Sequence, residues 1–594
     1  MSASVVDDRD LARGAVRLSD GVAHPASADD RAGTPDIRRI AFRRRPDGRL
    51  QGAPRIIAIV VAVATFCSMF WMYFRRIGKN PAGFFCDEAE IGVRTWQLIH
   101  GTLPEGSPRF PLFYNHFGTV HLGALPLYTT APFMMIFGPS EWSVRLASVF
   151  WSTVAIVALL VLVRTLRLRN GWIGVAAFAL SPIAIHVARI TFGHAGSFAA
   201  MALGLAVYAA GRERRSAWMM IVAGALLGIS VYGYASWYFA TPLLMVSLAM
   251  GELIANGLRW CERRRWTPFV TAALACLIVW IPVVYRALTN PAFADRFRSK
   301  ELSAGTDSGW NAERLRSMLD QYPKYFSFDF LVRYGDVGFI SRHSVKGAGL
   351  FPWIVLALVV IGAVAVVLHR RATTAKVIGI AALGVTILMP LPDLPTTSPN
   401  TLPYSFSVYS MLIGVPILCA FGVSMVSGWI GGRVPSSWRQ AVIPVVLSAI
   451  VLVGAWSFYR GPYANYPDVS ADYWGWQFGP GPAFEAFLAD NNQHDHYYLD
   501  SDYNGADAFP QFYLLDHPDM AAKSGLGSPH EHMVSMERDM YAVKPDRWEH
   551  FVGPHDALRQ YARLVDIIYY PDGTPALLIL SISLQNGLAP ANNW

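Results

Sequence analysis

The stretch RIIAIVVAVATFCSMFWMYF at residues 55–74, followed by GFFCDEAEIG at residues 83–92, is the most informative part of the chain. An apolar run of about 20 residues is long enough to cross a lipid bilayer as a helix. Carboxylates are costly if they enter a membrane, yet Asp87, Glu88 and Glu90 follow this run closely. The sequence therefore predicts a membrane-spanning helix with a functional acidic group just beyond its end.

The composition places the whole chain in the class of polytopic membrane proteins. Hydrophobic residues make up 53% of the 594 residues and charged residues only 15%, whereas soluble domains carry about 25% charged residues. The net charge of +8 comes largely from short basic clusters between apolar runs, where it sets topology. We therefore expect no nucleic-acid partner. The five cysteines form no CxxC pair, so neither a disulfide framework nor a cysteine metal site is expected.

Placing the basic clusters in the cytoplasm predicts eleven spans and an external C-terminus. The expected spans lie near residues 55–74, 143–163, 171–188, 196–211, 217–233, 237–255, 267–288, 349–368, 377–391, 406–427 and 440–458. The apolar segment 117–138 contains two prolines and is interpreted as an interfacial or re-entrant helix. The alternative, a twelfth span, would invert every later loop.

The regions outside the spans differ from one another in character. Residues 1–54 are polar and predict a disordered cytoplasmic tail. Residues 75–142 form the first external loop of a membrane domain over 55–458. Residues 459–594 are polar and acidic, and we expect a small external α/β domain there. Its candidate strands are His496–Asp500, Asp566–Tyr570 and Leu577–Ile582, and its candidate helices lie near 482–491 and 554–564.

The acidic pair Asp87 and Glu88 is the first candidate for chemistry. A carboxylate at this depth can act as a general base on an attacking hydroxyl or amine. It can also bind a divalent metal. The alternative is a structural one, in which Asp87 caps the helix that begins here.

Cationic and aromatic residues supply the remaining candidates. Arg189 and His194 follow the third expected span, and Arg342 and His343 lie in the loop 335–344 with Asp336. Such donors suit an anionic substrate, although Arg189 could instead reach lipid headgroups and Arg342 could pair with Asp336. Tyr232 and Tyr234 either belong to an interfacial aromatic belt or stack on a sugar or an isoprenoid.

Several motifs together resemble a known family over residues 55–460. They are the acidic pair in the first external loop, Phe137-Gly138 with Glu141 and Arg145-Leu146, Ser181-Pro182 with Arg189, and Tyr232 with Tyr234. In this order they are similar to the GT-C-fold membrane glycosyltransferases, in particular the protein O-mannosyltransferases and the aminoarabinose transferases of lipid A. The loops around Asp336 and around residues 399–400 also resemble those of bacterial members.

The resemblance implies a hexosyl- or pentosyltransferase with a polyprenyl-phosphate sugar donor and an inverting transfer outside the cytoplasm. Asp87 matches the catalytic carboxylate, with Glu88 beside it. Many relatives carry another acid after the third span, and this chain does not. A divalent metal therefore stays open, with His194 or Glu90 as substitutes for that acid.

In this interpretation Asp87 is the base, while Arg189 and Arg342, with His343, bind the donor phosphate. Substrate contacts fall to a further set, namely Tyr232, Tyr234, His194 and Asp336. The acceptor is an unknown glycan, lipid or protein, and the chain lies among the lipids of the inner or plasma membrane with a cytoplasmic N-terminus. Two other functions compete: a transporter or flippase for lipid-linked sugars, and a non-catalytic envelope assembly or sensor protein.

Overall fold

The computed structural model describes residues 53–104, 107–118, 120–257, 263–291, 293, 312–336, 338, 340, 342–369, 373–394, 403–430, 439–529, 538–551 and 557–583. The disordered tail predicted for residues 1–54 lies outside this part of the chain, apart from its last two residues. The loop residues 399–400 also lie outside the described part of the chain.

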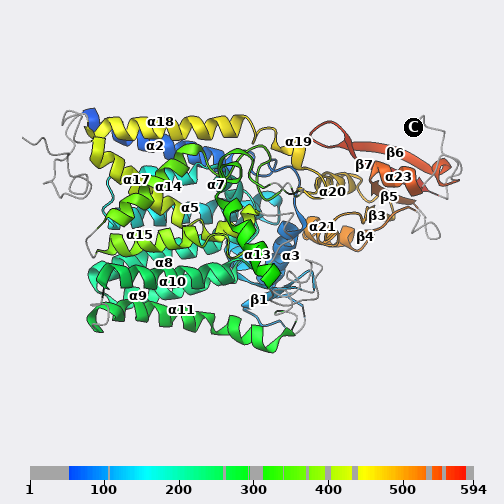
Figure 1. The fold of residues 1–594 in the computed structure, drawn as a ribbon. Helices are drawn as coiled ribbons and strands as arrows, with labels where there is room; N and C mark the ends of the chain where they lie inside the picture. The colour runs from blue at the N-terminus through cyan, green and yellow to red at the C-terminus, as the bar shows by residue number, and fades with distance from the viewer. Residues whose placement is uncertain are drawn as a thin grey trace, which may run out of the picture.

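The described chain forms a block of aligned helices with an α/β part at one end (Figure 1). Helices α2 (Ala53–Phe74) and α18 (Arg439–Arg460) lie side by side at one edge, and α9 (Ala217–Ile229) and α11 (Arg263–Thr289) form the opposite edge. The other long apolar helices lie between these edges. They are α5 (Glu141–Thr165), α8 (His194–Arg214), α10 (Trp237–Asn256), α14 (Trp353–Leu368), α15 (Thr374–Ile387) and α17 (Gly414–Ile430).

Within the described residues, six helices are long and apolar enough to cross a membrane, namely α2, α5, α8, α10, α11 and α18. A seventh span arises if the segment Ser405–Met411, which contains α16 (Ser405–Val408) and η6 (Tyr409–Met411), is joined to α17 across their bend of 61°. Three shorter apolar helices, at 217–232, 353–368 and 374–387, coincide with expected spans. A multi-pass membrane protein is thus supported, and the number eleven stays a prediction.

The third expected span is broken into α6 (Trp172–Ala179) and α7 (Pro182–Ala188). Proline lacks an N–H and fixes its φ angle, so it starts a helix readily and interrupts one. Pro182 occupies the first turn of α7. The break turns the end of α7 and the following residues 189–193 toward the connection between α2 and α3, and this brings Arg189 and Thr191 next to it.

The connection between α2 and α5 carries three elements that define the functional end of the bundle. Helix α3 (Cys86–His100) ends at Gly101, whose φ of 69° lies in the left-handed region. Strands β1 (Phe113–His116) and β2 (Val120–Gly123) form an antiparallel hairpin, and α4 (Leu125–Phe137) follows. A helix of 13 residues is about 20 Å long, short of the ~30 Å apolar core. Since α9 and α15 are similarly short, the interfacial helix stays a prediction.

The connections between α9 and α10 and between α11 and α14 contribute shorter elements at the same end. These are η1 (Ser230–Tyr232), α13 (Ala312–Gln321), η3 (Tyr322–Phe326) and the π-helical turn η4 (Asp329–Arg333). They precede the loop around Asp336 and Arg342, which packs against α7 and against the segment that begins at Tyr404.

The C-terminal region contains a five-stranded mixed sheet in the order β4-β3-β5-β7-β6. Its strands are β3 (His496–Leu499), β4 (Ser524–Leu526), β5 (Arg538–Val543), β6 (Ala562–Tyr569) and β7 (Pro575–Ser583). Strand β3 is parallel to β4 and β5, whereas β7 is antiparallel to β5 and β6. The helices of this region are α19 (Tyr466–Ser470), α20 (Pro480–Ala489), α21 (Ala508–Tyr513), α22 (Pro518–Ala521) and α23 (Pro545–Phe551).

All three candidate strands lie within this sheet, and α20 covers the first candidate helix. The helix predicted near 554–564 is wrong where the chain is described. Residues 557–560 form only the 3-10 turn η7 (Ala557–Gln560), and Ala562 begins β6. Pairing with β7 outweighs local helix propensity here, because tertiary packing overrides weak intrinsic preferences.

Candidate functional site

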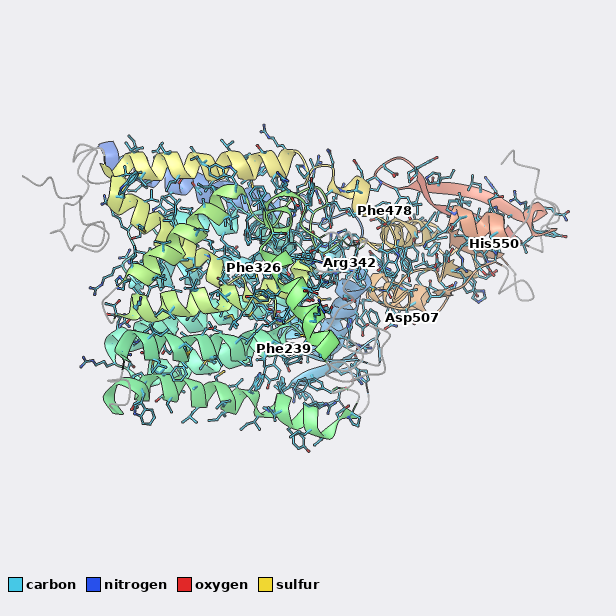
Figure 2. The ribbon with its side chains drawn as sticks, in the orientation of Figure 1. Phe239, Phe326, Arg342, Phe478, Asp507 and His550 are labelled. Carbon is cyan, nitrogen blue, oxygen red and sulfur yellow. The ribbon has the colours of Figure 1, made fainter. Side chains whose placement is uncertain are left out.

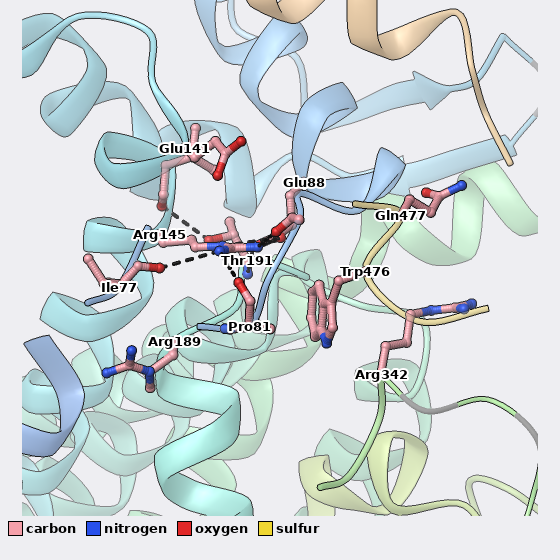
Figure 3. Close-up of polar contacts among 12 residues, drawn as sticks. Ile77, Pro81, Glu88, Glu141, Arg145, Arg189, Thr191, Arg342, Trp476 and Gln477 are labelled. Atoms are coloured by element: carbon pink, nitrogen blue, oxygen red, sulfur yellow. Dashed lines mark hydrogen bonds and ion pairs between the residues drawn. The ribbon is translucent and has the colours of Figure 1, made fainter. Parts of the chain in front are cut away.

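The three acids that follow the first helix have three different environments. Glu88 is completely buried, and its carboxylate accepts hydrogen bonds from Arg145 Nη2 (2.7 Å) and from the Thr191 backbone N–H (2.9 Å). Figure 3 shows this carboxylate held between α5 and the residues after α7. A base must be reached by its substrate. The burial of Glu88 corrects the prediction of a catalytic role and gives it a structural one.

Arg145 is the partner that fixes Glu88, and it is equally buried. Besides Glu88, its guanidinium donates to the backbone carbonyls of Ile77 (3.3 Å), Pro81 (3.1 Å) and Gly83 (2.6 Å). Figure 3 shows Arg145 between Glu88 and the carbonyls of Ile77 and Pro81. One side chain from α5 thus holds the whole connection between α2 and α3 in place.

Glu90 is also occupied by structural contacts. Its Oε1 accepts hydrogen bonds from Arg94 Nε (2.8 Å) and from the backbone N–H of Phe117 (3.2 Å), which fastens the hairpin to α3. Its side chain is only 3% exposed, whereas that of Asp87 is 25% exposed. Of these three acids, Asp87 has the accessible carboxylate.

Asp87 lies in the first turn of α3 but does not cap it. The N-cap position belongs to Phe85, and no side-chain hydrogen bond caps the helix. The capping alternative is therefore wrong in this structure. The first turn of a helix favours a negative charge, since the peptide dipoles point their positive ends there. Asp87 is thus placed where an ionised carboxylate is stabilised while part of it faces outward.

His116 on β1 is the neighbour of Asp87 that the sequence did not identify as a site residue. Its Nε2 lies 3.3 Å from Asp87 Oδ1. Its Nδ1 is buried and has no hydrogen-bond partner among the described residues. The two residues are 29 positions apart, and the hydrogen bond from the Phe117 N–H to Glu90 holds His116 beside α3. In the sequence, the only indication of a role for His116 is that it directly precedes the apolar segment 117–138.

Arg342 lies on the other side of Phe85 from this pair. Its guanidinium carbon is 4.0 Å from the centre of the Phe85 ring, and Nη1 donates to the carbonyl of Trp474 (2.7 Å). The Arg342 carbonyl is bound in turn by His186 Nε2 at 2.7 Å. The Nε atom has no hydrogen-bond partner among the described residues. Arg342 is therefore a positioned, partly exposed cation next to the start of α3.

The thiol of Cys86 reports how close Asp87 and Arg342 come to one another. Burial raises the pKa of Cys86 well above its usual value, the neighbouring Asp87 charge raises it further, and Arg342 opposes both. Since charges shift a pKa only at short range, both groups lie near this sulfur. Asp87 and Arg342 therefore both lie near the start of α3.

Arg189 does not join them, which corrects the prediction that it binds the donor phosphate. It is completely buried, and its guanidinium donates to backbone carbonyls at the end of α2, including those of Tyr73 (3.0 Å), Arg75 (2.7 Å) and Asn80 (2.8 Å). The last carbonyls of a helix have no partner within the helix. Arg189 supplies that partner, and all three of its nitrogen atoms are used.

Replacing Arg189 with alanine is expected to lower the free energy of unfolding by about 2–3 kcal/mol, because buried carbonyls lose their donors. The KM for the lipid donor should stay within twofold of wild type in the folded fraction. Thermal unfolding of the purified protein in detergent and donor titration measure the two effects. Arg214→Ala, at the exposed end of α8, is the control and should change neither quantity. A rise in KM without loss of stability would restore the phosphate-binding role.

Three further predicted residues meet around Phe406. The ring of Phe406 lies 4.2 Å from His194, 5.3 Å from Tyr234 and 5.1 Å from His343, measured between ring centres. His194 Nδ1 accepts a hydrogen bond from the Trp237 indole (3.2 Å), while its buried Nε2 has no partner among the described residues. His194, Phe406 and His343 are buried, so the cluster packs the interior, and Tyr234 is its partly exposed member.

Ring contacts through Phe192 connect the cluster to the start of α3. Phe192 lies 5.0 Å from Phe406 and 5.7 Å from Phe85, which neighbours the acidic pair in sequence. His343 is buried, and its Nε2 lies 2.7 Å from the Tyr404 hydroxyl. A direct phosphate contact by His343 is therefore not supported by the geometry. Its place in the cluster suggests a packing role.

Tyr232 is separate from the cluster. Its hydroxyl donates to the carbonyl of Val279 on α11 (2.7 Å), and its ring packs against Phe113 of β1. These contacts attach the hairpin to the bundle. They correct the prediction that Tyr232 binds substrate.

Asp336 joins two loops rather than pairing with Arg342. Its carboxylate accepts hydrogen bonds from the backbone N–H and the hydroxyl of Ser405, both at 2.7 Å. Burial raises the pKa of Asp336 to about 6, although the hydrogen bonds from Ser405 oppose the shift. The structure thus gives Asp336 a structural role in place of the predicted substrate contact.

The raised pKa of Asp336 predicts a pH-dependent stability. The folded state keeps the proton up to a pH of about 6, whereas the unfolded chain loses it near 3.8. Stability should therefore fall by about 1–3 kcal/mol between pH 4 and pH 6 and stay level above. Thermal unfolding of wild type and Asp336→Asn across pH 4–7 measures this. Asp336→Asn should lack the fall in stability that Asp336 causes between pH 4 and pH 6. If the stability of the two proteins changes in parallel with pH, the raised pKa of Asp336 is contradicted.

The C-terminal region completes the site from outside the bundle. Gln477 Oε1 accepts a hydrogen bond from the backbone N–H of Cys86 (3.0 Å), and a Cβ on Gly83 would lie 2.4 Å from the Trp476 carbonyl. Phe512 of α21 packs against Gly92 of α3. Figure 2 shows Arg342 at this junction between the bundle and the α/β part.

A pocket of about 520 Å³ lies close to the hairpin. It is bounded by α3, by residues 103–104 and 107–115, which include the first part of β1, and by α11. Its lining includes Arg94, Tyr114 and Arg286. Its residue Asn115 precedes His116 directly. Among the described residues, no three His, Cys, Asp or Glu side chains gather closely enough to hold a metal ion.

Comparison with known proteins supports the resemblance found in the sequence. The family model described as dolichyl-phosphate-mannose-protein mannosyltransferase matches residues 123–285, a segment that runs from the end of β2 into α11. It includes Arg145 and Arg189 but not Asp87 or Arg342. No curated protein sequence matches the chain significantly. Residues 123–285 are thus similar to the protein O-mannosyltransferases that the sequence motifs resemble.

Several solved structures show similarity at low sequence identity. ArnT from Cupriavidus metallidurans bound to undecaprenyl phosphate is 13% identical, with 90% of this chain and 99% of that chain covered and a TM-score of 0.49. Its apo form is 14% identical, with 88% and 97% covered and a TM-score of 0.46. The oligosaccharyltransferase AglB from Archaeoglobus fulgidus, with an inhibitory peptide and dolichol phosphate, is 11% identical, with 91% and 75% covered and a TM-score of 0.44.

Proposed function

We propose that this chain transfers a sugar from a polyprenyl-phosphate donor to an acceptor, with inversion at the sugar and with Asp87 as the general base. The observation that carries the proposal is that an accessible carboxylate and a positioned cation both lie near the start of α3. Asp87 is the exposed acid of three, and Arg342 is a positioned cation beside the same residues. The matching family is named for mannose transfer from dolichyl phosphate, which supports the donor class.

The proposed reaction is a single displacement at the anomeric carbon. Asp87 takes the proton from the acceptor hydroxyl or amine while that atom forms its bond to the carbon. The bond from this carbon to the phosphate oxygen breaks, and the polyprenyl phosphate leaves with the electron pair. Arg342 neutralises the negative charge that develops on the phosphate. His116, at 3.3 Å from Asp87 Oδ1, orients the carboxylate.

The membrane setting fits this chemistry. A lipid donor keeps its phosphate at the level of the headgroups. Helix α3 and strand β1 of the hairpin lie at one end of the helical block (Figure 1), and Arg342 lies at the same end (Figure 2). We place this end outside the cytoplasm, with the N-terminus inside, because the short loops at the other end carry the basic clusters. The pocket of about 520 Å³ beside the hairpin is the proposed entry for the acceptor.

Reconstitution of the purified chain with radiolabelled polyprenyl-phosphate sugars tests the function. The expected result is release of polyprenyl phosphate and a labelled product whose anomeric configuration, read by NMR, is opposite to that of the donor. Retained configuration would contradict the single displacement. Movement of intact lipid-linked sugar across proteoliposomes without cleavage would instead establish a flippase.

Arg342→Ala is expected to raise the KM for the lipid donor by about 10- to 100-fold, because a charge-assisted contact to the phosphate is lost. Arg342→Lys should recover part of the affinity, since the charge returns without the forked geometry. Arg333→Ala is the matched control. Arg333 is an exposed arginine that, like Arg342, precedes α14 in the chain, and it pairs with Asp329. An unchanged KM in Arg342→Ala would show that the phosphate binds elsewhere.

A further inference from the structure

A second pocket, of about 480 Å³, lies where α2 and α18 end together. Its walls are the last turns of the two helices and the residues that follow each of them. Four of the lining residues are basic, namely Arg75, Arg76, Lys79 and Arg460, and none of the lining residues is acidic. All four basic residues are exposed. The pocket is therefore a concentrated and accessible positive site.

Positive charge at this end of the bundle runs against the orientation proposed above, in which this end lies outside the cytoplasm. Basic residues normally gather on the cytoplasmic side of membrane proteins, yet these four share the end of the bundle that carries α3 and Asp87 (Figure 1). A topological signal does not account for them. A bound anion at the membrane surface does.

Aromatic rings fix two of the cations in place. The Arg75 guanidinium lies 4.6 Å from the centre of the Trp71 ring, and that of Arg460 lies 5.0 Å from the Trp456 ring. The two indole rings are themselves 4.9 Å apart across the α2–α18 contact. Tryptophan at the end of a span marks the level of the lipid headgroups. The two guanidinium groups thus stand at headgroup depth, one from each helix.

Asn80 adds a neutral polar group to the same pocket. Its Nδ2 donates to the carbonyl of Tyr463 (2.8 Å), while its buried Oδ1 has no hydrogen-bond partner among the described residues. An acceptor without a partner suits a ligand that brings a hydroxyl group. A phosphate with an attached glycerol carries both the negative charge and such hydroxyls.

We propose that this pocket binds the headgroup of an anionic glycerophospholipid, with the phosphate against Arg75 and Arg460 and the headgroup hydroxyls toward Asn80. Basic pockets between membrane helices bind anionic lipid headgroups by this chemistry. The site is distinct from the proposed donor site, because the buried Arg189 holds the Arg75 and Asn80 carbonyls from the inner side. The inference stands independently of the transfer reaction.

Native mass spectrometry of the full-length chain tests this lipid site. The protein is extracted from nanodiscs that contain equal amounts of phosphatidylglycerol and phosphatidylcholine. Wild type should retain phosphatidylglycerol selectively, and Arg75→Ala with Arg460→Ala should retain it about tenfold less or lower still. The cap on α2 uses the Arg75 carbonyl and not its side chain, so the variant keeps that cap. Arg333→Ala should behave as wild type.

Competition separates the possible sources of the phosphate. Retention that survives millimolar inorganic phosphate and an equimolar polyprenyl phosphate supports the proposal. Full displacement by inorganic phosphate would show a free-anion site, and full displacement by polyprenyl phosphate would show a donor site. Either displacement would overturn the proposal, as would equal retention of the two phospholipids or unchanged retention in the double variant.

Discussion

Asp87→Asn is expected to lower the rate of sugar transfer by about 10²- to 10⁴-fold, the usual contribution of a general base. Asparagine has nearly the same shape but cannot take a proton from the acceptor. The side chain of Asp87 is 25% exposed, so the substitution removes no buried ion pair and the fold should remain. Initial rates with a labelled lipid donor measure the loss.

Two further variants serve as controls for Asp87→Asn. Asp87→Glu keeps a carboxylate and should retain more activity than Asp87→Asn, with the loss due to position alone. Asp507→Asn makes the same change at an exposed acid next to α21 and should transfer at the wild-type rate. Equal losses in Asp87→Asn and Asp507→Asn would point to a general effect on the protein.

Arg145→Ala is expected to lower the free energy of unfolding by about 3–5 kcal/mol, since it leaves the Glu88 carboxylate buried without its partner. Both side chains are completely buried. The substitution also removes the donor to three carbonyls of the connection between α2 and α3. Thermal and denaturant unfolding of the purified protein measure the change.

Removing both charges separates the ion pair from the hydrogen bonds. The double variant Glu88→Leu with Arg145→Met should be more stable than Arg145→Ala, because no unpaired charge stays buried. Glu88→Gln should transfer sugar in proportion to its folded fraction. If Glu88→Gln folds as wild type yet loses transfer by 100-fold or more, Glu88 is a catalytic residue and the structural assignment fails.

Composition and hydrophobic runs were sufficient to predict the class of fold. Length and apolar content identify α2 and the other long helices, and the polar periodicity after Asp87 identifies α3. These features depend on a few neighbouring residues. The mixed sheet was predicted only in part, because β4 has three residues and is only partly buried.

The roles of individual side chains could not be predicted from neighbouring residues in the sequence. Asp87 and Glu88 are adjacent in the sequence, but successive helical residues point about 100° apart. One faces Arg145, which is 57 residues from Glu88, and the other faces His116. Local sequence carries no information about either partner. The two predicted catalytic acids therefore separate only in the folded chain.

The roles of the two arginines were equally hard to predict from the local sequence. Arg189 follows an apolar run and Arg342 lies in a loop before one, and both were predicted to bind phosphate. The break between α6 and α7 turns Arg189 inward onto the end of α2, whereas the Arg342 guanidinium stays beside Phe85. The contact between Gln477 and Cys86 spans 391 positions, so the part played by the C-terminal region was also beyond prediction.

The most direct test of the account is a single-turnover measurement on purified Asp87→Asn loaded with a labelled polyprenyl-phosphate sugar. Bound donor and transferred sugar are counted in the same sample. The account predicts donor binding at the wild-type level and transfer slower by about 100-fold or more. Transfer within twofold of the wild-type rate, at equal donor occupancy, would contradict the assignment of Asp87 as the base.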